Sequence, residues 1–178
     1  MNLGQIWRGS WDMANNVKSE FELYEPMRVW LQQYLEDKYK TAHIITVDSH
    51  ARTLDLYLEE YGVIDQYPQT LGLDIQIDVL GIVTKKSKSQ IFFIEAKKTQ
   101  LNLHDLGQLW AYCKLCDPAE AFLLSSNGLG SLNKILNNLS RTDLLEFGDG
   151  KLIKKMHVGK WDISKNAIDY REFIPKGN

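Results

Sequence analysis

The stretch 71–97, LGLDIQIDVLGIVTKKSKSQIFFIEAK, decides the expected fold. Residues 71–83 alternate between apolar and polar side chains, which is typical of a β-strand with one buried face. Val79 is expected to point the same way as the two isoleucines before it, and Asp74 and Asp78 to point the other way. A charged side chain on a strand that is otherwise buried is normally either paired or functional.

The second half of the stretch predicts a partner strand. Residues 84–89 (TKKSKS) form a polar turn, and 90–97 (QIFFIEAK) is an apolar segment that becomes charged only at its end. The two strands are expected to form a hairpin whose second strand is buried. Glu95 and Lys97 share one face because strand side chains alternate, and Ala96 between them faces the core.

The flanking sequence predicts further helices and strands. A capping box, Ser19 and Glu22, begins the first helix, whose apolar residues recur on one face. The remaining expected elements are a strand at 41–48, helices at 51–61, 102–115 and 131–139, a strand at 119–125, and two or three short strands within 144–174. This order favours an α/β fold (α+β type) with a mixed β-sheet flanked by helices. No linker or repeat interrupts it, so 1–178 is expected to form one domain.

The composition is that of an ordinary globular protein. The 178 residues are 44% hydrophobic and carry a net charge of −2. No run approaches the roughly 18 apolar residues that a membrane span needs, and residues 1–10 contain no apolar signal core. A cytoplasmic protein with no membrane partner is therefore expected. Cys113 and Cys116 match no common zinc spacing and are expected to pack in the core.

Charge is distributed unevenly along the chain. No basic residue occurs between Arg52 and Lys85, where six acidic residues fall, and lysine-rich stretches follow at 85–98 and 151–160. Lysine runs are usually a solvated surface, but two basic patches around an acidic centre also suit an enzyme that holds a phosphate backbone. A DNA-binding role is one hypothesis for the second group of lysines, Lys151, Lys154, Lys155 and Lys160.

Asp78, Glu95 and Lys97 are the candidate catalytic residues. If the two strands pair, the carboxylates meet and repel each other unless a cation lies between them. Mg²⁺ suits such a site because it prefers hard oxygen ligands and retains several waters. Lys97 would orient or help deprotonate a metal-bound water and offset charge on the phosphate. Two interpretations stay open: a simple surface pair of Glu95 and Lys97, and Asp74 in place of Asp78.

These residues resemble a known family. Asp78 in QIDVLGI and Glu95-Ala96-Lys97 in FFIEAK are similar to the active-site signature of the PD-(D/E)XK nuclease superfamily, which includes most type II restriction endonucleases. The resemblance covers roughly 19–130 and departs from the pattern at Ile77, where the family name has proline.

Two further elements extend the resemblance. Gln108-Leu-Trp-Ala-Tyr112 is similar to the Q-x-x-x-Y element of RecB-like members, and its end residues lie one helical turn apart. The segment Glu22-Leu-Tyr-Glu-Pro26 resembles the entry helix of restriction-type members, where an acidic residue supports metal binding. For Glu22 the capping box is the alternative role.

The resemblance implies a restriction endonuclease-like core and specific roles. Asp78 and Glu95 would bind Mg²⁺, or Mn²⁺ in its place, together with the carbonyl of Ala96 and with support from Glu22. Lys97 would place the attacking water, and Gln108 would contact Lys97 or the scissile phosphate. The implied reaction is hydrolysis of a phosphodiester bond in double-stranded DNA, leaving a 5′-phosphate.

The leading hypothesis is a type II restriction endonuclease or its catalytic subunit, acting as a homodimer or with a second chain. Two alternatives are open. One is a structure-specific or end-processing nuclease of repair and recombination. The other is an inactive module on the same fold that binds DNA or a partner protein.

Overall fold

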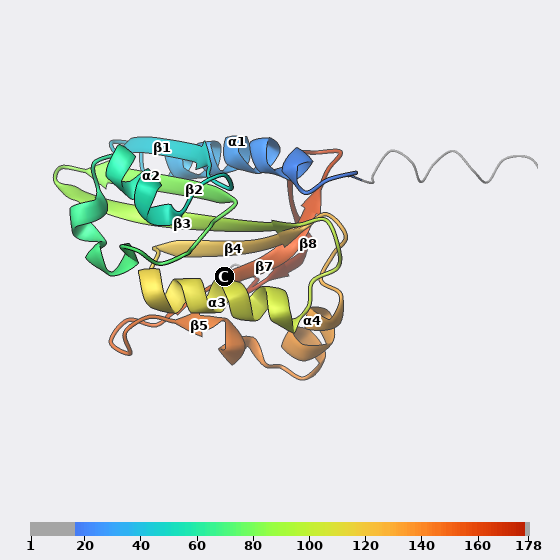
Figure 1. Ribbon diagram of the computed structural model, residues 1–178. Coiled ribbons are helices and arrows are strands. Elements are labelled where there is room, and N and C mark those ends of the chain that lie inside the picture. The colour runs from blue at the N-terminus through green and yellow to red at the C-terminus, as the bar shows by residue number, and fades with distance from the viewer. Residues whose placement is uncertain (1–16, 177–178) are drawn as a thin grey trace, which may run out of the picture.

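A mixed β-sheet of six strands forms the centre of the protein (Figure 1). The structure is a computed structural model that describes residues 17–176. The strands lie in the order β1-β2-β3-β4-β7-β8. Their bounds are His43–Asp48, Val79–Lys85, Lys88–Lys97, Glu120–Ser125, His157–Asp162 and Ala167–Ile174. β3, β4 and β7 run parallel, and the other neighbours are antiparallel. The predicted α/β fold with a mixed sheet flanked by helices is confirmed.

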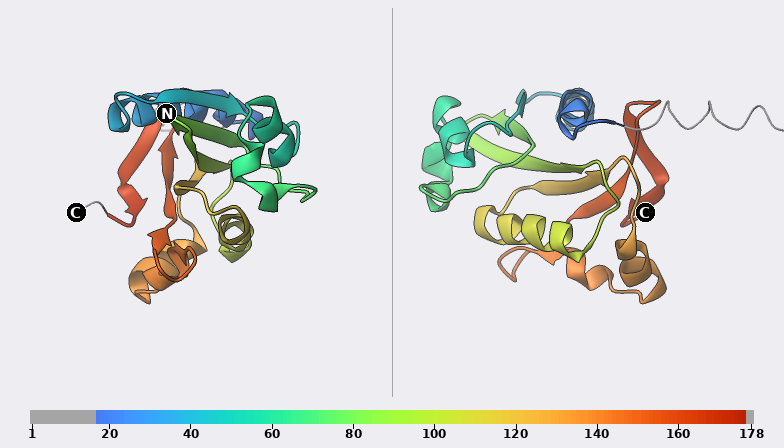
Figure 2. Two further views of the ribbon diagram at one scale, coloured as in Figure 1. Left: turned by 90° about the vertical axis from the view of Figure 1, so that its left-hand side faces the viewer. Right: turned by 45° about the vertical axis from the view of Figure 1, so that its right-hand side comes forward.

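Helices cover both faces of the sheet. The α-helices are α1 (Phe21–Lys38), α2 (Leu54–Glu60), α3 (Leu103–Cys116) and α4 (Ser131–Asn133), the last continued by the π-helical turn η4 (Lys134–Asn138). Figure 2 shows α1 on one face of the sheet and α2 and α3 on the other. Short 3-10 turns occur at η2 (Ile64–Gln66), η3 (Pro68–Thr70) and η5 (Thr142–Leu145), and a small ladder joins β5 (Glu146–Phe147) to β6 (Lys154–Lys155).

Two apolar layers result, one on each face. In the first, the buried stripe of α1 packs on Phe92 and Ile94 of β3. In the second, Leu109 of α3 belongs to the layer that contains Ile91 and Phe93. Neighbouring residues of β3 therefore face opposite layers, and the strand is buried on both sides, as its apolar run predicts.

The predicted hairpin and crossover are both present. β2 pairs with β3 from Val79↔Ile94 to Lys85↔Lys88, so the lysine-rich turn lies at the far end of the hairpin from Glu95. α3 then crosses over and places β4 parallel to β3, as expected. Cys113 and Cys116 are free and buried in the layer under α3, in agreement with a packing role.

The predicted strand 71–83 is wrong in its first half. The chain is extended through 73–77 but joins the ladder only at Val79, after a bend at Asp78. Because of this bend, Ile77 belongs to the layer under α3 while Val79 belongs to the layer under α1, so they do not point the same way. Ser49, directly after β1, holds the bend by donating its backbone N–H to the carbonyl of Asp78.

The connection that follows β3 is fixed by a close backbone approach. Gly130, with φ of +51°, begins α4, and a Cβ atom there would lie 2.5 Å from the carbonyl oxygen of Leu101. Only glycine fits this contact, which joins the loop after β3 to the loop after β4. The carboxyl ends of the two parallel strands are thereby held together.

Residues 1–10, in which the sequence contains no apolar signal core, lie outside the described residues. Among the helices formed between residues 17 and 176, none combines the length and apolar composition that crossing a bilayer requires.

Candidate metal centre

The structure brings Asp78, Glu95, Lys97 and Gln108 together at the carboxyl end of β3. The Lys97 ammonium lies 2.9 Å from Glu95 Oε1, and Gln108 Nε2 donates to the same oxygen at 3.2 Å. The Asp78 carboxylate accepts the backbone N–H of Ala96 at 2.8 Å. Three segments that are distant in sequence therefore meet around Glu95.

Asp78 holds this position because the ladder between β2 and β3 has ended. The last pair is Val79↔Ile94, so no β2 residue pairs with Ala96. The Asp78 side chain takes the N–H that the next strand residue would otherwise bind. The prediction that Asp78 lies mid-strand is wrong, since it sits in the bend before β2, but its carboxylate still meets the strand that carries Glu95. The N–H and carbonyl of one strand residue point to the same side, so the Ala96 carbonyl faces the Asp78 side as well.

The Glu95 carboxylate is buried, the Asp78 carboxylate is half-buried, and the two repel each other. Glu95 is 3% exposed; burial raises the pKa of its carboxyl, the charge of Asp78 raises that pKa further, and Lys97 opposes the change. Burial also raises the pKa of Asp78, against the opposing hydrogen bond from Ala96 and the charge of Lys97. Burial lowers the pKa of Lys97, but the charges of Glu95 and Asp78 outweigh this and raise it overall, so the lysine stays protonated.

The residues present fit a divalent cation. Glu95 Oε2 is buried and has no hydrogen-bond partner within the described part of the chain, which is costly for a carboxylate oxygen unless a further ligand satisfies it. Between residues 17 and 176 no three side chains of His, Cys, Asp or Glu converge as a metal cluster. The side chains therefore supply two carboxylates, with the Ala96 carbonyl as a third oxygen. Mg²⁺ tolerates so small a protein ligand set because it keeps several waters.

Gln108 reaches Glu95 because the start of α3 is fixed. Asn102 caps the helix by accepting the N–H groups of His104 and Asp105, and the Asp105 carboxylate accepts the N–H of Asn102 in return. This reciprocal capping box sets the helix rotation, so that Gln108 faces the sheet. Tyr112, one turn later, places its hydroxyl 3.4 Å from Gln108 Nε2. The two ends of the Q-x-x-x-Y element thus act on the same side of α3, as predicted.

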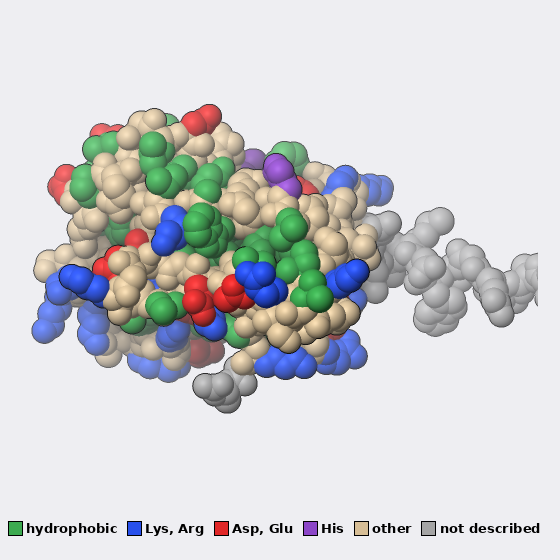
Figure 3. Space-filling model, turned by 90° about the horizontal axis from the view of Figure 1, so that it is seen from below, with side chains coloured by type: hydrophobic (Ala, Val, Ile, Leu, Met, Phe, Trp, Pro, Cys, Tyr) green, Lys and Arg blue, Asp and Glu red, His purple; other side chains and the backbone are tan. Residues whose placement is uncertain are grey.

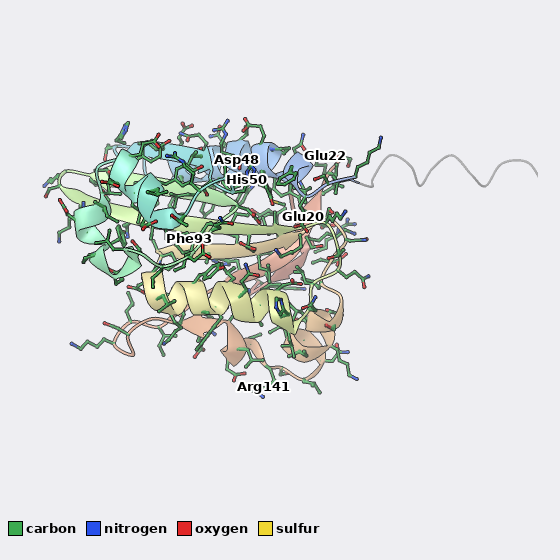
Figure 4. The ribbon with its side chains drawn as sticks, in the orientation of Figure 1. Glu20, Glu22, Asp48, His50, Phe93 and Arg141 are labelled. Atoms are coloured by element: carbon green, nitrogen blue, oxygen red, sulfur yellow. The ribbon has the colours of Figure 1, made fainter. Side chains whose placement is uncertain are left out.

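The structure places Glu22 away from the centre and Glu20 close to it. The Glu22 carboxylate accepts the backbone N–H groups of Lys18 and Ser19 at the start of α1, which is the capping role. Glu20 accepts the N–H of Lys98, and its charge raises the pKa of both Asp78 and Glu95. Figure 4 shows Glu20 turned toward the sheet and Glu22 at the helix. The expectation that Glu22 supports the metal is therefore wrong in position.

Sequence reasoning also missed Tyr24, Asp48 and His50. Tyr24 lies beside Asp78; burial and the Asp78 charge raise the pKa of its hydroxyl. Asp48 ends β1 and binds His50 Nδ1, and the His50 ring lies 5.1 Å from the Tyr24 ring. The sequence does contain a signal for Tyr24: it lies on the apolar stripe of a helix, and a buried hydroxyl needs a polar partner.

Asp74 is not next to the centre. It is exposed and lies four residues before Asp78 on an extended segment, which separates the two by roughly 13 Å along the chain. Of the two candidate aspartates, Asp78 is the one that meets Glu95.

The lysines of the C-terminal stretch lie in two different places. Lys154 binds Asp117 at 2.8 Å and Lys155 pairs with Glu146, both at the end of the molecule where β4 begins. Lys160 instead lies in register with Ser125, which is in register with Lys97, across three neighbouring strands. On the face shown in Figure 3, basic and acidic side chains are interspersed and do not form one basic surface.

The centre thus combines two carboxylates, a buried oxygen that lacks a partner, and a protonated lysine in contact with one carboxylate. Comparisons of the chain with protein-family models, with curated proteins and with solved structures found no match.

Proposed function

We propose that this protein is a cytoplasmic, Mg²⁺-dependent deoxyribonuclease whose centre is Asp78, Glu95 and Lys97. The observation that carries the proposal is the carboxylate pair in which the buried Glu95 Oε2 has no partner within 17–176 while Lys97 contacts Oε1. A structural ion pair would not need the second carboxylate, because Asp78 adds repulsion to a buried group. A cation held between the carboxylates would explain both features, because it would offset their repulsion and give Glu95 Oε2 a partner.

Asp78, Glu95 and the Ala96 carbonyl would hold the cation. When bound, Mg²⁺ supplies Lewis-acid polarisation of the phosphate and lowers the pKa of water. Mn²⁺ has similar ligand preferences and is expected to substitute for it. The remaining chemistry belongs to residues of the chain.

Lys97 supports hydrolysis as a cation. Its raised pKa favours the protonated form, so it donates hydrogen bonds to a phosphate oxygen or orients the attacking water. The water oxygen bonds to phosphorus while the bond to the 3′ oxygen breaks; the attacking water gives its proton to the surrounding solvent, and the 3′ oxygen takes one from solvent. The products are a 5′-phosphate and a 3′-hydroxyl. Gln108 holds Glu95 in position through its hydrogen bond.

A type II restriction endonuclease remains the leading specific form, in which two copies, or this chain and a second subunit, cut both strands of double-stranded DNA. An end-processing nuclease is the second candidate, favoured by the contact of Gln108 with both Glu95 and Tyr112. A catalytically inactive binding module is the third alternative. It does not account for an intact group of two carboxylates and a lysine.

The experiment is to incubate the purified chain with long unmethylated DNA in Mg²⁺ and to separate the products by size. Discrete bands support a restriction endonuclease, and a smear or shortening from the ends supports an end-processing nuclease. The matched control is Lys97→Met, which removes the ammonium and keeps the length of the side chain. Intact DNA with the original chain, or equal cleavage by Lys97→Met, would overturn the proposed centre.

A further inference from the structure

Phe21 is an exposed aromatic ring beside the proposed centre. The periodicity of α1 predicts Phe21 on the buried stripe with Tyr24 and Met27, but the structure leaves it 63% exposed. Its ring lies 5.6 Å from the Tyr24 ring and 4.9 Å from the His50 ring. The three rings form one cluster, of which Phe21 is the outermost member.

The other two rings hold Phe21 in place. Tyr24 is buried, at 5% exposure, and belongs to the apolar layer under α1. His50 is tied to Asp48 through Nδ1 and lies 5.1 Å from Tyr24. A ring supported on two sides has already lost most of its rotational freedom, so a ligand that stacks on it meets little ordering cost. Single exposed hydrophobic residues are ordinary on protein surfaces. Phe21 differs from them because the Tyr24 and His50 rings support it on two sides.

The cluster is continuous with the carboxylate pair. Tyr24 joins the two: its ring lies 5.6 Å from the Phe21 ring, and burial and the Asp78 charge raise the pKa of its hydroxyl. Lys98 lies on the same side, with its backbone N–H bound to Glu20 and its ammonium on the carbonyl of Lys18. The exposed ring suits the base of a nucleotide, and the nearby lysine and the proposed centre suit its phosphate. Figure 4 shows Glu20, Asp48 and His50, which mark the limits of this region.

We propose that Phe21 stacks on an unpaired base of the DNA substrate, next to the phosphodiester bond that is cut. The inference rests on the proposed nuclease function and agrees with its end-processing form, not with its restriction endonuclease form. It specifies the substrate as DNA with an unpaired nucleotide, such as a single strand, a flap or a frayed end. Bases inside a duplex are stacked on both sides and offer no free face to a protruding ring. Aromatic stacking tolerates every base, so Phe21 selects for strand structure and not for sequence.

Binding measured in Ca²⁺, in place of Mg²⁺, tests this without cleavage. The ligands are a fluorescent single strand and a blunt duplex of the same sequence. Phe21→Ala should weaken single-strand binding about 5- to 100-fold and leave duplex binding within about twofold, since each stacked base contributes on this scale. Phe21→Trp should retain the single-strand affinity. Tyr170→Ala is the matched control, because Tyr170 is also 63% exposed but lies on β8.

The outcomes separate this inference from the function on which it rests. If the original chain cleaves DNA but Phe21→Ala binds the single strand normally, or loses both ligands equally, base stacking is wrong and the nuclease stands. If the original chain neither binds nor cleaves either DNA with any of the metals, both proposals fail. If Phe21→Ala instead lowers the sedimentation coefficient, the ring covers a second protein chain and the inference is wrong.

Discussion

The Asp78 carboxylate accepts the N–H of Ala96 at 2.8 Å, where a further β2 residue would pair if the ladder continued. This contact joins the bend before β2 to the strand that carries Glu95. It holds the half-buried Asp78 beside the buried Glu95 although their charges repel. The site is therefore produced by the place where a strand pairing ends.

Asp78→Asn tests this relationship, because an amide oxygen still accepts the Ala96 N–H but carries no charge. Without divalent cations the free energy of unfolding of the variant should exceed that of the original chain by about 1 kcal/mol, because the repulsion with Glu95 is removed. The original chain should gain about 2.7 kcal/mol in Mg²⁺ at 100 times its dissociation constant, and the variant much less. Thermal unfolding with and without Mg²⁺ measures both effects. An equal gain in the two proteins would remove Asp78 from the metal centre.

Glu20→Gln and Glu22→Gln form a matched pair at the start of α1. Glu20 acts on both carboxylates through its charge, so Glu20→Gln should weaken divalent cation binding about fivefold. Glu22 only accepts backbone N–H groups at the helix start, so Glu22→Gln should leave cation binding unchanged. Calorimetric titration with Mn²⁺ distinguishes them. The reverse order of effects would restore Glu22 as the supporting acid.

The sequence predicted the central hairpin, the crossover and the face shared by Glu95 and Lys97, because these follow from local periodicity. It did not predict the bend at Asp78, since both sides of that bend are apolar alternations that read as one strand. Glu20 and His50 were missed for another reason: the approach of Glu20 to Asp78, and of the His50 ring to Tyr24, depends on how α1 and the end of β1 pack on the sheet. Such long-range contacts leave no local pattern.

Lys160 and Lys154 differ in their distance from the centre and should differ in DNA binding. Lys160 shares a register row with Lys97, and with Ser126 and Arg171 it lines a pocket of about 310 Å³ at that end of the sheet. Lys154 is held by Asp117 at the opposite end of β4. Lys160→Ala should reduce the slope of log affinity against log salt by about one unit, and Lys154→Ala should leave it unchanged. A reduced salt slope for Lys154→Ala alone would instead indicate that the DNA binds along the surface of β6.

Glu120 provides a pH test of the fold that is independent of the centre. Burial raises its pKa, but the nearby His157 ring and the hydrogen bonds from Lys38 and Tyr34 outweigh this and lower it to about 2. A carboxyl whose pKa is lower in the folded state stabilises the protein when the pH is above the ordinary pKa of 4.5. This contribution is lost as the pH falls toward 2. Glu120→Gln should therefore cost about 2 kcal/mol at neutral pH, allowing for solvent screening, and almost nothing near pH 2. Denaturant unfolding across this range measures the difference, and a cost that is independent of pH would contradict the ion-pair network.

The metal dependence of DNA cleavage tests the central claim most directly. A labelled DNA that contains both single- and double-stranded regions is incubated with the original chain in Mg²⁺, Mn²⁺, Ca²⁺ or EDTA. The Asp78–Glu95 centre predicts cleavage to 5′-phosphate products in Mg²⁺ and Mn²⁺, binding without cleavage in Ca²⁺, and intact DNA in EDTA. Undiminished cleavage in EDTA, or intact DNA in every metal, would contradict the assignment of this carboxylate pair as a nuclease centre.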